Sequence, residues 1–445
     1  MKTIRFGIYA LVAFVVLSFG GVEAWGQAAL EIGAGCLFFV WGVEALRRRR
    51  LEIRWHWLYL PLLGIGVVAL AQILFGISVY PYLTKVELLK WGAYVLLLFL
   101  TIESFRTEEH FQELVWFFLG LGFVVSLFAI VQHFTFNGKL YWLVALPGGG
   151  APFGPFVNSN HFAGFVELIA PLGLALLLFR ARRTEQVPML VLFTVVLVGA
   201  LVLSGSRGGI IGLALEIVLL AILSRTHQVG RKQLLGAAGI ALLAGAFALW
   251  LGVSTAVQHF EKLAHGGIAQ ELRVSIYKDT WRTFLDRPWM GTGLGTLVTA
   301  YPRYASFYDG RVVDHAHNDY LELLADTGVI GGLCGLTFIG LLLWSGLKGL
   351  QAASVRCERA IRAGSLVACA GLLVHSLVDF NLHIPSNALI FLLLAGVATV
   401  ERAELREKVE RFRRLREKAA AEGINNGGLP DQNDKETRTP ELAPR

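Results

Sequence analysis

Runs of apolar residues follow one another along almost the whole chain and limit what it can fold into. Apolar residues make up 55% of the 445 residues, and charged residues only 16%. Many runs approach the ~20 residues that a helix needs to cross ~30 Å of hydrocarbon, where the backbone must satisfy its own hydrogen bonds. The sequence therefore predicts an all-α, polytopic integral membrane protein with about 12 transmembrane helices. The expected spans are residues 5–22, 26–46, 57–76, 86–104, 111–133, 161–179, 188–204, 208–224, 234–253, 320–346, 363–380 and 387–400.

Basic residues indicate how these spans are oriented. If the N-terminus is cytoplasmic, most of the 40 Lys and Arg residues fall on the cytoplasmic side, including the run at 47–50 and the tail after residue 400. Short loops rich in Lys and Arg remain inside. The sequence thus predicts cytoplasmic N- and C-termini. The first span is expected to be an uncleaved anchor, although Val22-Glu23-Ala24 also resembles a signal-peptidase site.

Changes in composition divide the chain into three parts. Residues 1–400 form the expected transmembrane domain, with one long external loop at 254–319. Within this loop, residues 270–286 carry apolar positions at helical spacing, which predicts a helix on the membrane surface. Residues 401–421 predict a charged cytoplasmic helix, and residues 422–445, rich in Gly, Asn, Pro and charge, predict a disordered tail.

Several common classes of site are not supported by the residue patterns. The four Cys are scattered without a CxxC pair or zinc spacing, so we expect neither a disulfide framework nor a metal site. Gly291, Gly293 and Gly295 imitate part of a dinucleotide-binding loop, but no strand precedes them, and no cofactor is expected. The net charge of +7 follows from membrane orientation and gives no reason to expect nucleic acid.

The long loop ends in a dense polar cluster, His315-Ala-His317-Asn318-Asp319-Tyr-Leu-Glu322. Such a group beside a bilayer is costly unless it handles protons or a polar ligand, although a polar interfacial collar is the plainer alternative. His317 is the candidate general base. Asp319 or Glu322 could orient its ring through the second ring nitrogen. For Asp319, however, we favour a cap at the start of the helix that follows.

Arg207 lies in a second candidate site, the short external turn Ser204-Gly-Ser206-Arg207-Gly-Gly209. Small neighbours let a ligand approach the backbone, and the next helix directs its positive N-terminal dipole at the same point, which suits a phosphate. Glycine-rich helix packing with a snorkelled Arg is the structural alternative. Arg273, on the loop helix, is expected to face the same cavity. Lys278 and Arg282 are expected to form only a basic interfacial face.

Taken in order, these motifs resemble the O-antigen ligase and polymerase superfamily from about residue 70 to 400. The fragments that carry the resemblance are Asn158-Ser-Asn160-His161-Phe-Ala-Gly164, Ser204-Gly-Ser206-Arg207-Gly, Arg273 followed by Trp281, Pro288-Trp-Met-Gly291-Thr-Gly293-Leu-Gly295, His315-Ala-His317-Asn318-Asp-Tyr-Leu321 and Thr327-Gly328-Val-Ile-Gly331. The resemblance implies a glycosyltransferase of the bacterial inner membrane that moves a glycan from undecaprenyl diphosphate to an acceptor hydroxyl on the periplasmic face. It implies that Arg207 and Arg273 handle phosphate and that His317 is the loop histidine.

The resulting hypothesis is a metal-independent, inverting transfer catalysed by His317, Arg207 and Arg273. Lipid A–core ligation and glycan polymerisation remain open. The expected partners are the carrier-linked donor, a lipid or glycan acceptor, membrane lipids and other envelope polysaccharide assembly proteins. The residues expected to contact substrate are Asn158, Asn160, His161, Arg287, His315, Asn318, Asp319 and Glu322.

Polar residues inside the spans suggest a rival reading as a polysaccharide or lipid-linked glycan transporter or flippase. A proton path could be built from Glu87, Glu103, Glu167, Glu216, His375, Asp379 and His383. No internal repeat of the kind common in transporters is seen, and the stretch 375–383 could instead line the carrier's cavity. A non-catalytic assembly scaffold is a third reading, but it leaves the external Arg and His residues without a role.

Overall fold

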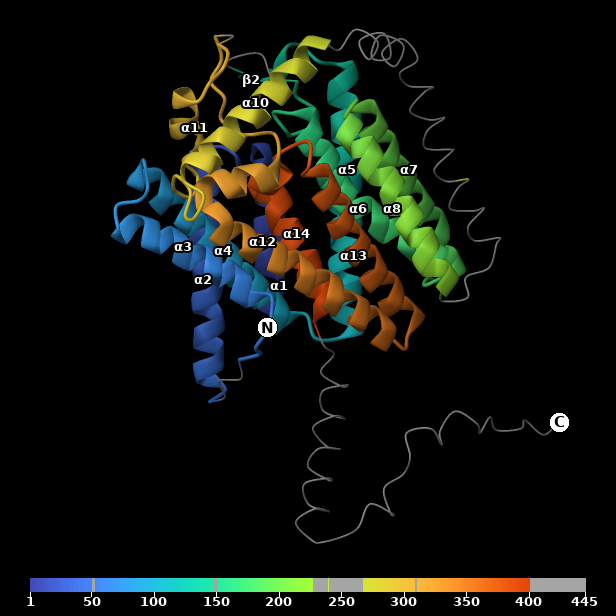
Figure 1. The fold of residues 1–445 in the computed structure, drawn as a ribbon. Coiled ribbons are helices and arrows are strands. Elements are labelled where there is room, and N and C mark those ends of the chain that lie inside the picture. Colours follow the sequence, from blue (N-terminus) through green and yellow to red (C-terminus); the bar gives the residue numbers. More distant parts are fainter. Residues whose placement is uncertain (50–52, 147–150, 227–238, 240–266, 309, 401–445) are drawn as a thin grey trace, which may run out of the picture. The chain divides into compact units, whose positions relative to one another are not determined.

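The chain is almost entirely helical in the part that the computed structural model describes, residues 1–49, 53–146, 151–226, 239, 267–308 and 310–400 (Figure 1). The long helices are α1 (Lys2–Leu17), α2 (Ala24–Arg47), α3 (Tyr59–Leu74), α4 (Pro81–Ser104), α5 (Glu108–Phe134), α6 (Ser159–Leu178), α7 (Val187–Leu203), α8 (Arg207–Thr226), α10 (Gly267–Asp286), α12 (Asp319–Ala352), α13 (Arg356–His375) and α14 (Pro385–Thr399). Short elements are η1 (Phe19–Gly21), η2 (Thr184–Gln186), α11 (Leu297–Ala300), η3 (Tyr301–Arg303), η4 (Asn381–His383) and the two-residue strands β1 (Lys139–Leu140) and β2 (Val144–Ala145).

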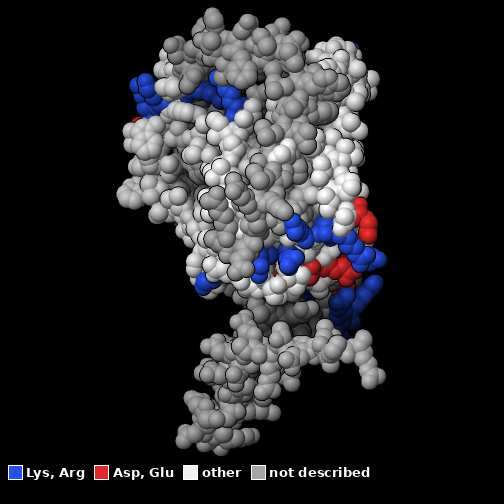
Figure 2. Space-filling view, turned by 90° about the vertical axis from the view of Figure 1, so that its right-hand side faces the viewer, with Lys and Arg blue, Asp and Glu red and all other residues white. Residues whose placement is uncertain are grey.

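Length and composition confirm a helical membrane protein. Among the described residues, six helical stretches are long and apolar enough to cross a bilayer: α2, α5, α6, Thr184–Leu203, α8 and α12. On the face in Figure 2, the described charged side chains gather toward the lower end and in a smaller group near the top, and the described side chains visible between the two groups are uncharged. The count of about 12 spans remains a prediction, because the expected span at 234–253 lies almost wholly outside the described residues.

The centre of the bundle is α6, which packs against α13, α7, α8 and α14. Of the apolar stretch of α6 that is long enough to cross a bilayer, 94% of the residues are buried, as expected for a helix that is hydrophobic on all sides. Close helix approach depends on small residues. A Cβ on Gly364 of α13, for example, would lie 3.0 Å from the backbone of Leu172 in α6. The described residues from Met1 to Val400 form one compact unit.

The long loop carries the helix expected at 270–286, observed as α10, which packs on α12. Its placement on a membrane surface remains a prediction. Buried Asp279 anchors the segment that follows, because its carboxylate accepts hydrogen bonds from the Tyr301 hydroxyl at 3.1 Å and from Ser306 N at 2.8 Å. The loop is therefore fixed to its own helix by a satisfied buried carboxylate.

The glycines at 291–295 have a structural role. A Cβ on Gly291 would lie 2.3 Å from the backbone carbon of Asp326, so only glycine permits this contact with α12. Gly328, with φ +66°, breaks the regular geometry of α12 and meets the backbone of Trp289 equally closely. Gln72 Oε1 accepts a hydrogen bond from Leu294 N at 2.9 Å and ties the turn to α3.

One expected span ends differently from the prediction. Residues 363–380 were expected to be helical, but α13 stops at His375 and the next residues leave the helix. Their backbone groups bind other segments: the Ser376 carbonyl accepts from Asp319 N at 3.0 Å, and the Val378 carbonyl accepts from Arg273 Nη1 at 3.2 Å. The charged helix expected at 401–421 and the tail at 422–445 lie outside the described residues.

Candidate active site

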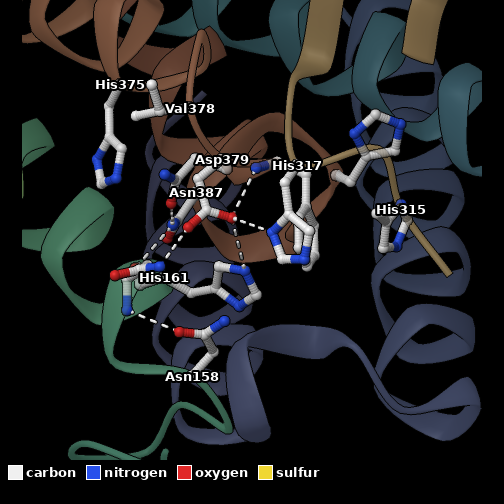
Figure 3. Close-up of polar contacts among 12 residues, drawn as sticks. Asn158, His161, His315, His317, His375, Val378, Asp379 and Asn387 are labelled. Atoms are coloured by element: carbon white, nitrogen blue, oxygen red, sulfur yellow. Dashed lines mark hydrogen bonds and ion pairs between the residues drawn. The ribbon is translucent and has the colours of Figure 1, made fainter. Parts of the chain in front are cut away.

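The candidate site lies at one end of the bundle, where α6, α8, α12 and α14 begin and α13 ends. The short connection between α13 and α14, residues 376–384, contains η4 and runs through the site. The helix α10 packs on α12, which begins there. Figure 3 shows Asp379 of this stretch between the rings of His317 and His161. Segments that are far apart in the sequence thus meet around one short connection.

Asp379 is the polar centre of this arrangement, with a side chain only 1% exposed. Its Oδ1 accepts a hydrogen bond from Phe380 N at 2.9 Å, and its Oδ2 accepts one from Asn160 Nδ2. The Nδ1 of His317 lies 3.5 Å from Oδ1, and the Nε2 of His161 lies 3.9 Å from the same oxygen. These two contacts are longer than ordinary hydrogen bonds.

His317 is held firmly although it lies in a loop. Its φ of +52° is left-handed, a strained conformation that histidine tolerates better than most residues. The Tyr277 hydroxyl donates to its carbonyl at 2.9 Å, and its ring meets Phe380 edge to face at 5.0 Å. With Nδ1 directed at Asp379 and a side chain 25% exposed, His317 can present its other nitrogen to a substrate. Asp379 is therefore the carboxylate that faces this ring. Asp319 and Glu322, which the sequence suggests as possible orienting groups, contact other residues.

Asp319 and Glu322 instead contact two other histidines, His383 and His315. Asp319 Oδ1 lies 2.7 Å from His383 Nδ1, and Glu322 Oε1 lies 2.7 Å from His315 Nδ1 and 3.2 Å from His383 Nε2. Burial disfavours charge on His383, but Glu322 and Asp319 outweigh it and raise the pKa of His383 to about 10. The expected helix cap is also corrected: Asn318, rather than Asp319, caps α12 by accepting from the two N–H groups that follow Asp319, at 3.0 and 2.9 Å.

The set His315, Glu322 and His383 has ligand atoms within 4.8 Å of one another and could hold a metal ion. Imidazole and carboxylate are ligands that Zn²⁺ accepts. Glu322 already contacts both histidines, through a hydrogen bond with His315 and an ion pair with His383, so an ion would have to replace those contacts. The expectation of a metal-free site is therefore best tested by measuring transfer in the presence of a chelator.

The two arginines expected to handle phosphate come from segments that adjoin the same connection. Arg273 of α10 binds it directly, because its Nη1 donates to the Val378 carbonyl at 3.2 Å. Arg207 is exposed and is the first residue of α8. Its neighbour Gly208 lies against the end of α13 and the connection, since a Cβ there would come 2.4 Å from His375 Nε2 and 3.3 Å from Val378 Cγ2. Arg273 therefore contacts the stretch that carries Asp379, and Arg207 begins a helix whose next residue packs against it.

The first predicted motif has a mainly architectural role. Asn158 caps α6 by accepting from Asn160 N at 2.9 Å, and Asn160 binds Asp379. His161 is buried, and its carbonyl accepts from Asn387 Nδ2 at 2.9 Å. These contacts fix the start of α6 against the connection between α13 and α14.

Arg287 is held elsewhere. Its Nη1 donates to the carbonyl of Ile77 at 2.8 Å, which ties the end of α10 to the turn before α4. Among the described residues, no contact joins it to the group around Asp379, so its expected contact with substrate remains a prediction without structural support.

Residues of the connection were underestimated by sequence reasoning. Asp379 and His383 appeared only as candidates for a proton path or a cavity lining, and Phe380 was not considered. Phe380 contacts the rings of His161, His315 and His317 with centroid distances of 4.6, 4.3 and 5.0 Å. The available signal is the density of polar residues at 375–387, from the end of one expected span to the start of the next.

Comparison with known proteins agrees with the motifs. A family model described as O-antigen ligase matches residues 192–336, which include Arg207, Arg273 and His317. The chain is also similar to the teichuronic acid biosynthesis protein TuaE of Bacillus subtilis (strain 168), at 25% identity over 391 residues, covering 82% of this chain and 76% of that protein. The two matches confirm that this membrane protein is similar to the O-antigen ligase and polymerase superfamily.

Proposed function

We propose that this protein is a glycosyltransferase that moves an oligo- or polysaccharide from undecaprenyl diphosphate to an acceptor hydroxyl at the periplasmic face of the bacterial inner membrane. The observation that carries the proposal is that Arg273, His317 and the start of α8, which carries Arg207, all lie against one short connection. Phosphate binding and proton removal are the two tasks that such a transfer requires.

In the proposed step, the acceptor oxygen forms a bond to the anomeric carbon as the bond from that carbon to the diphosphate oxygen breaks. The diphosphate leaves with the bonding electron pair, and Arg207 and Arg273 stabilise its increasing negative charge. His317 takes the hydroxyl proton, and the carboxylate of Asp379 stabilises the imidazolium that forms. Because the acceptor attacks directly, the anomeric configuration inverts.

An apolar cavity beside the site supports a lipid-linked substrate. It has a volume of about 290 Å³ and lies among α3, α4, α12, α13 and α14. Leu62, Trp91 and Phe391 line its apolar part, and Asp319 and Tyr320 line the part at the start of α12. An isoprenoid or acyl chain with a polar head at the site matches this distribution of apolar and polar lining.

The polar residues in the spans favour this proposal over a transporter. Glu87 pairs with Lys90 near the start of α4, and Glu103 pairs with Arg106 at the other end of the same helix. Glu167 is bound to His375 at the end of α13 that adjoins the candidate site. Among the described residues, these three pairs do not connect into a continuous path across the bundle.

The test combines a deletion with reconstitution. Removing the protein should abolish one surface glycan and cause its carrier-linked unit to accumulate, and the identity of that glycan separates ligation from polymerisation. Purified full-length protein with that carrier-linked unit and acceptor should form product without an ion gradient, both with and without EDTA. If chelation stops transfer and Mg²⁺, Mn²⁺ or Zn²⁺ restores it, the metal-free mechanism is wrong and the set His315, Glu322 and His383 becomes the first place to look for a ligand group.

A further inference from the structure

His375 lies one helical turn before Asp379 and has no part in the mechanism above. It is the last residue of α13, and its side chain is only 1% exposed. Its Nδ1 lies 2.6 Å from Oε2 of Glu167, a carboxylate in the middle of α6 with no exposed surface. A carboxylate bound to one ring nitrogen fixes the orientation of an imidazole and directs the other nitrogen to a defined place.

That other nitrogen faces the start of α8. A Cβ on Gly208 would come 2.4 Å from His375 Nε2, so the ring lies directly against the helix backbone next to Arg207. One turn later, a Cβ on Gly212 would come 1.8 Å from Glu167 Oε1. The two glycines therefore make room for the pair against α8. Within the described part of the chain, Nε2 makes no hydrogen bond.

The surroundings of Nε2 suit an anion. The first N–H groups of a helix have no partner inside the helix, and the helix dipole favours negative charge at that end. Ser206 Oγ accepts from Gly209 N, which leaves the N–H groups of Arg207 and Gly208 at the helix end. Arg273 binds the Val378 carbonyl, and Val378 also packs against Gly208. The start of α8, which carries Arg207, the bound Arg273 and an imidazole nitrogen without a hydrogen bond thus adjoin one another.

We propose that His375, held by Glu167, is a third cationic donor to the diphosphate of the lipid carrier, beside Arg207 and Arg273. This inference rests on the proposed function. His375 donates Nδ1–H to Glu167 and Nε2–H to a phosphate oxygen, and the hydrogen bond strengthens as the anomeric C–O bond breaks and its electron pair remains on the diphosphate. No proton is transferred. His375 contacts the leaving group, and Glu167 acts as a positioning residue.

Binding can be measured without knowing the sugar. The full-length protein in lipid nanodiscs is titrated with undecaprenyl diphosphate and, as a control for the apolar tail, with undecaprenol. His375→Gln should weaken binding of undecaprenyl diphosphate by roughly 10- to 100-fold, the usual effect of losing a hydrogen bond between charged groups, and should leave undecaprenol binding unchanged. Gly208→Ala, which pushes a methyl group into the ring, should cause the same selective loss.

The role of Glu167 is tested by combining variants. Glu167→Gln should cause a smaller loss, and the double variant with His375→Gln should bind like His375→Gln alone, because Glu167 acts through the ring. Glu103→Gln is the matched control: Glu103 is equally buried, but it pairs with Arg106 at the far end of α4 and not with His375. It should bind undecaprenyl diphosphate like the wild type.

The inference is overturned if His375→Gln and Gly208→Ala bind undecaprenyl diphosphate like the wild type, or if the losses of His375→Gln and Glu167→Gln add. Such a result, together with loss of transfer in Arg207→Ala, removes His375 and leaves the proposed function intact. If Arg207→Ala also binds and transfers normally, the proposed function itself fails.

Discussion

At the scale of single residues, the site depends on which carboxylate faces which imidazole. Asp379 faces His317, whereas Glu322 binds His315 and Asp319 binds His383. The three histidines therefore have different carboxylate partners. Only His317 combines an exposed edge, a nearby carboxylate and a strained backbone that fixes its position, a combination that is frequent at active sites.

His317 should be the residue that accepts the proton of the acceptor. His317→Asn keeps a residue that tolerates left-handed backbone and should lower kcat by roughly 10²–10⁴-fold, while undecaprenyl diphosphate still binds. His315→Gln is the matched control and should reduce kcat much less. Equal losses in the two variants would mean that His317 has no special role in the reaction.

Arg207 and Arg273 should act as a clamp for the diphosphate. Arg207→Ala and Arg273→Ala should each abolish transfer while the protein remains in the membrane, because each loses a charge at the leaving group. Lys at either position should restore only part of the activity, since an ammonium group cannot reproduce the planar fork of Arg. Arg282→Ala, an exposed position on α10, is the control. Wild-type transfer by Arg207→Ala at matched expression contradicts the clamp.

At the scale of elements, the short connection between α13 and α14 organises the site. It contains η4, and its backbone binds Asp319 of α12 and Arg273 of α10, while its Asp379 binds Asn160 of α6. His383 of η4 adds an ion-paired contact to α12 through Asp319 and Glu322. The position of the connection relative to α12 should therefore depend on the charge of His383.

This dependence predicts how stability changes with pH. The pKa of His383 is raised to about 10 in the folded protein, whereas an unfolded imidazole titrates near ~6.5. The stabilisation is therefore fully present below about pH 6.5 and is lost as the pH rises through about 10. As the pH rises from about 6.5 to about 10, the Tm of the wild type should decrease. In His383→Gln, the Tm should decrease less over the same pH range. His133→Gln, a histidine of α5, should retain the wild-type slope, and an unchanged slope in His383→Gln would rule out this linkage.

At the scale of the whole molecule, an apolar bundle holds a polar site at one end and carries many basic residues at the other. The site lies where α6, α8, α12 and α14 begin, and Arg106, Arg182 and Arg356 lie at the opposite ends of the helices. Because basic loops remain in the cytoplasm, the site should face the periplasm.

Cysteine labelling tests this orientation. In a variant whose four native Cys are replaced, Gly310→Cys should react with a membrane-impermeant maleimide in intact spheroplasts. Ser354→Cys should react only after the membrane is permeabilised. Both positions are exposed in the structure, so a difference in labelling reports the side of the membrane. The reverse pattern would put the site in the cytoplasm and exclude a periplasmic transferase.

The sequence by itself determined the membrane class, the loop helix and the sparse set of charged residues available for chemistry. These follow from local composition and periodicity, because a long apolar run can hardly remain in water and a helical repeat indicates a helix. Arg207, Arg273 and His317 could be selected for the same reason: each is a charged or titratable group beside glycine, loop or span boundaries. Their motifs also carried the resemblance that the family match confirms.

Only the tertiary structure decided how these residues pair. Asp319 and Glu322 are close to His317 in sequence, but the left-handed turn at His317 and the Asn318 cap direct the helix side chains to His315 and His383. The partner of His317, Asp379, comes from a connection that looks like the end of a span, because its polar side chains are satisfied by segments far away in the sequence. Such contacts depend on how helices meet at the end of the bundle, and spacing within one segment contains no information about that meeting.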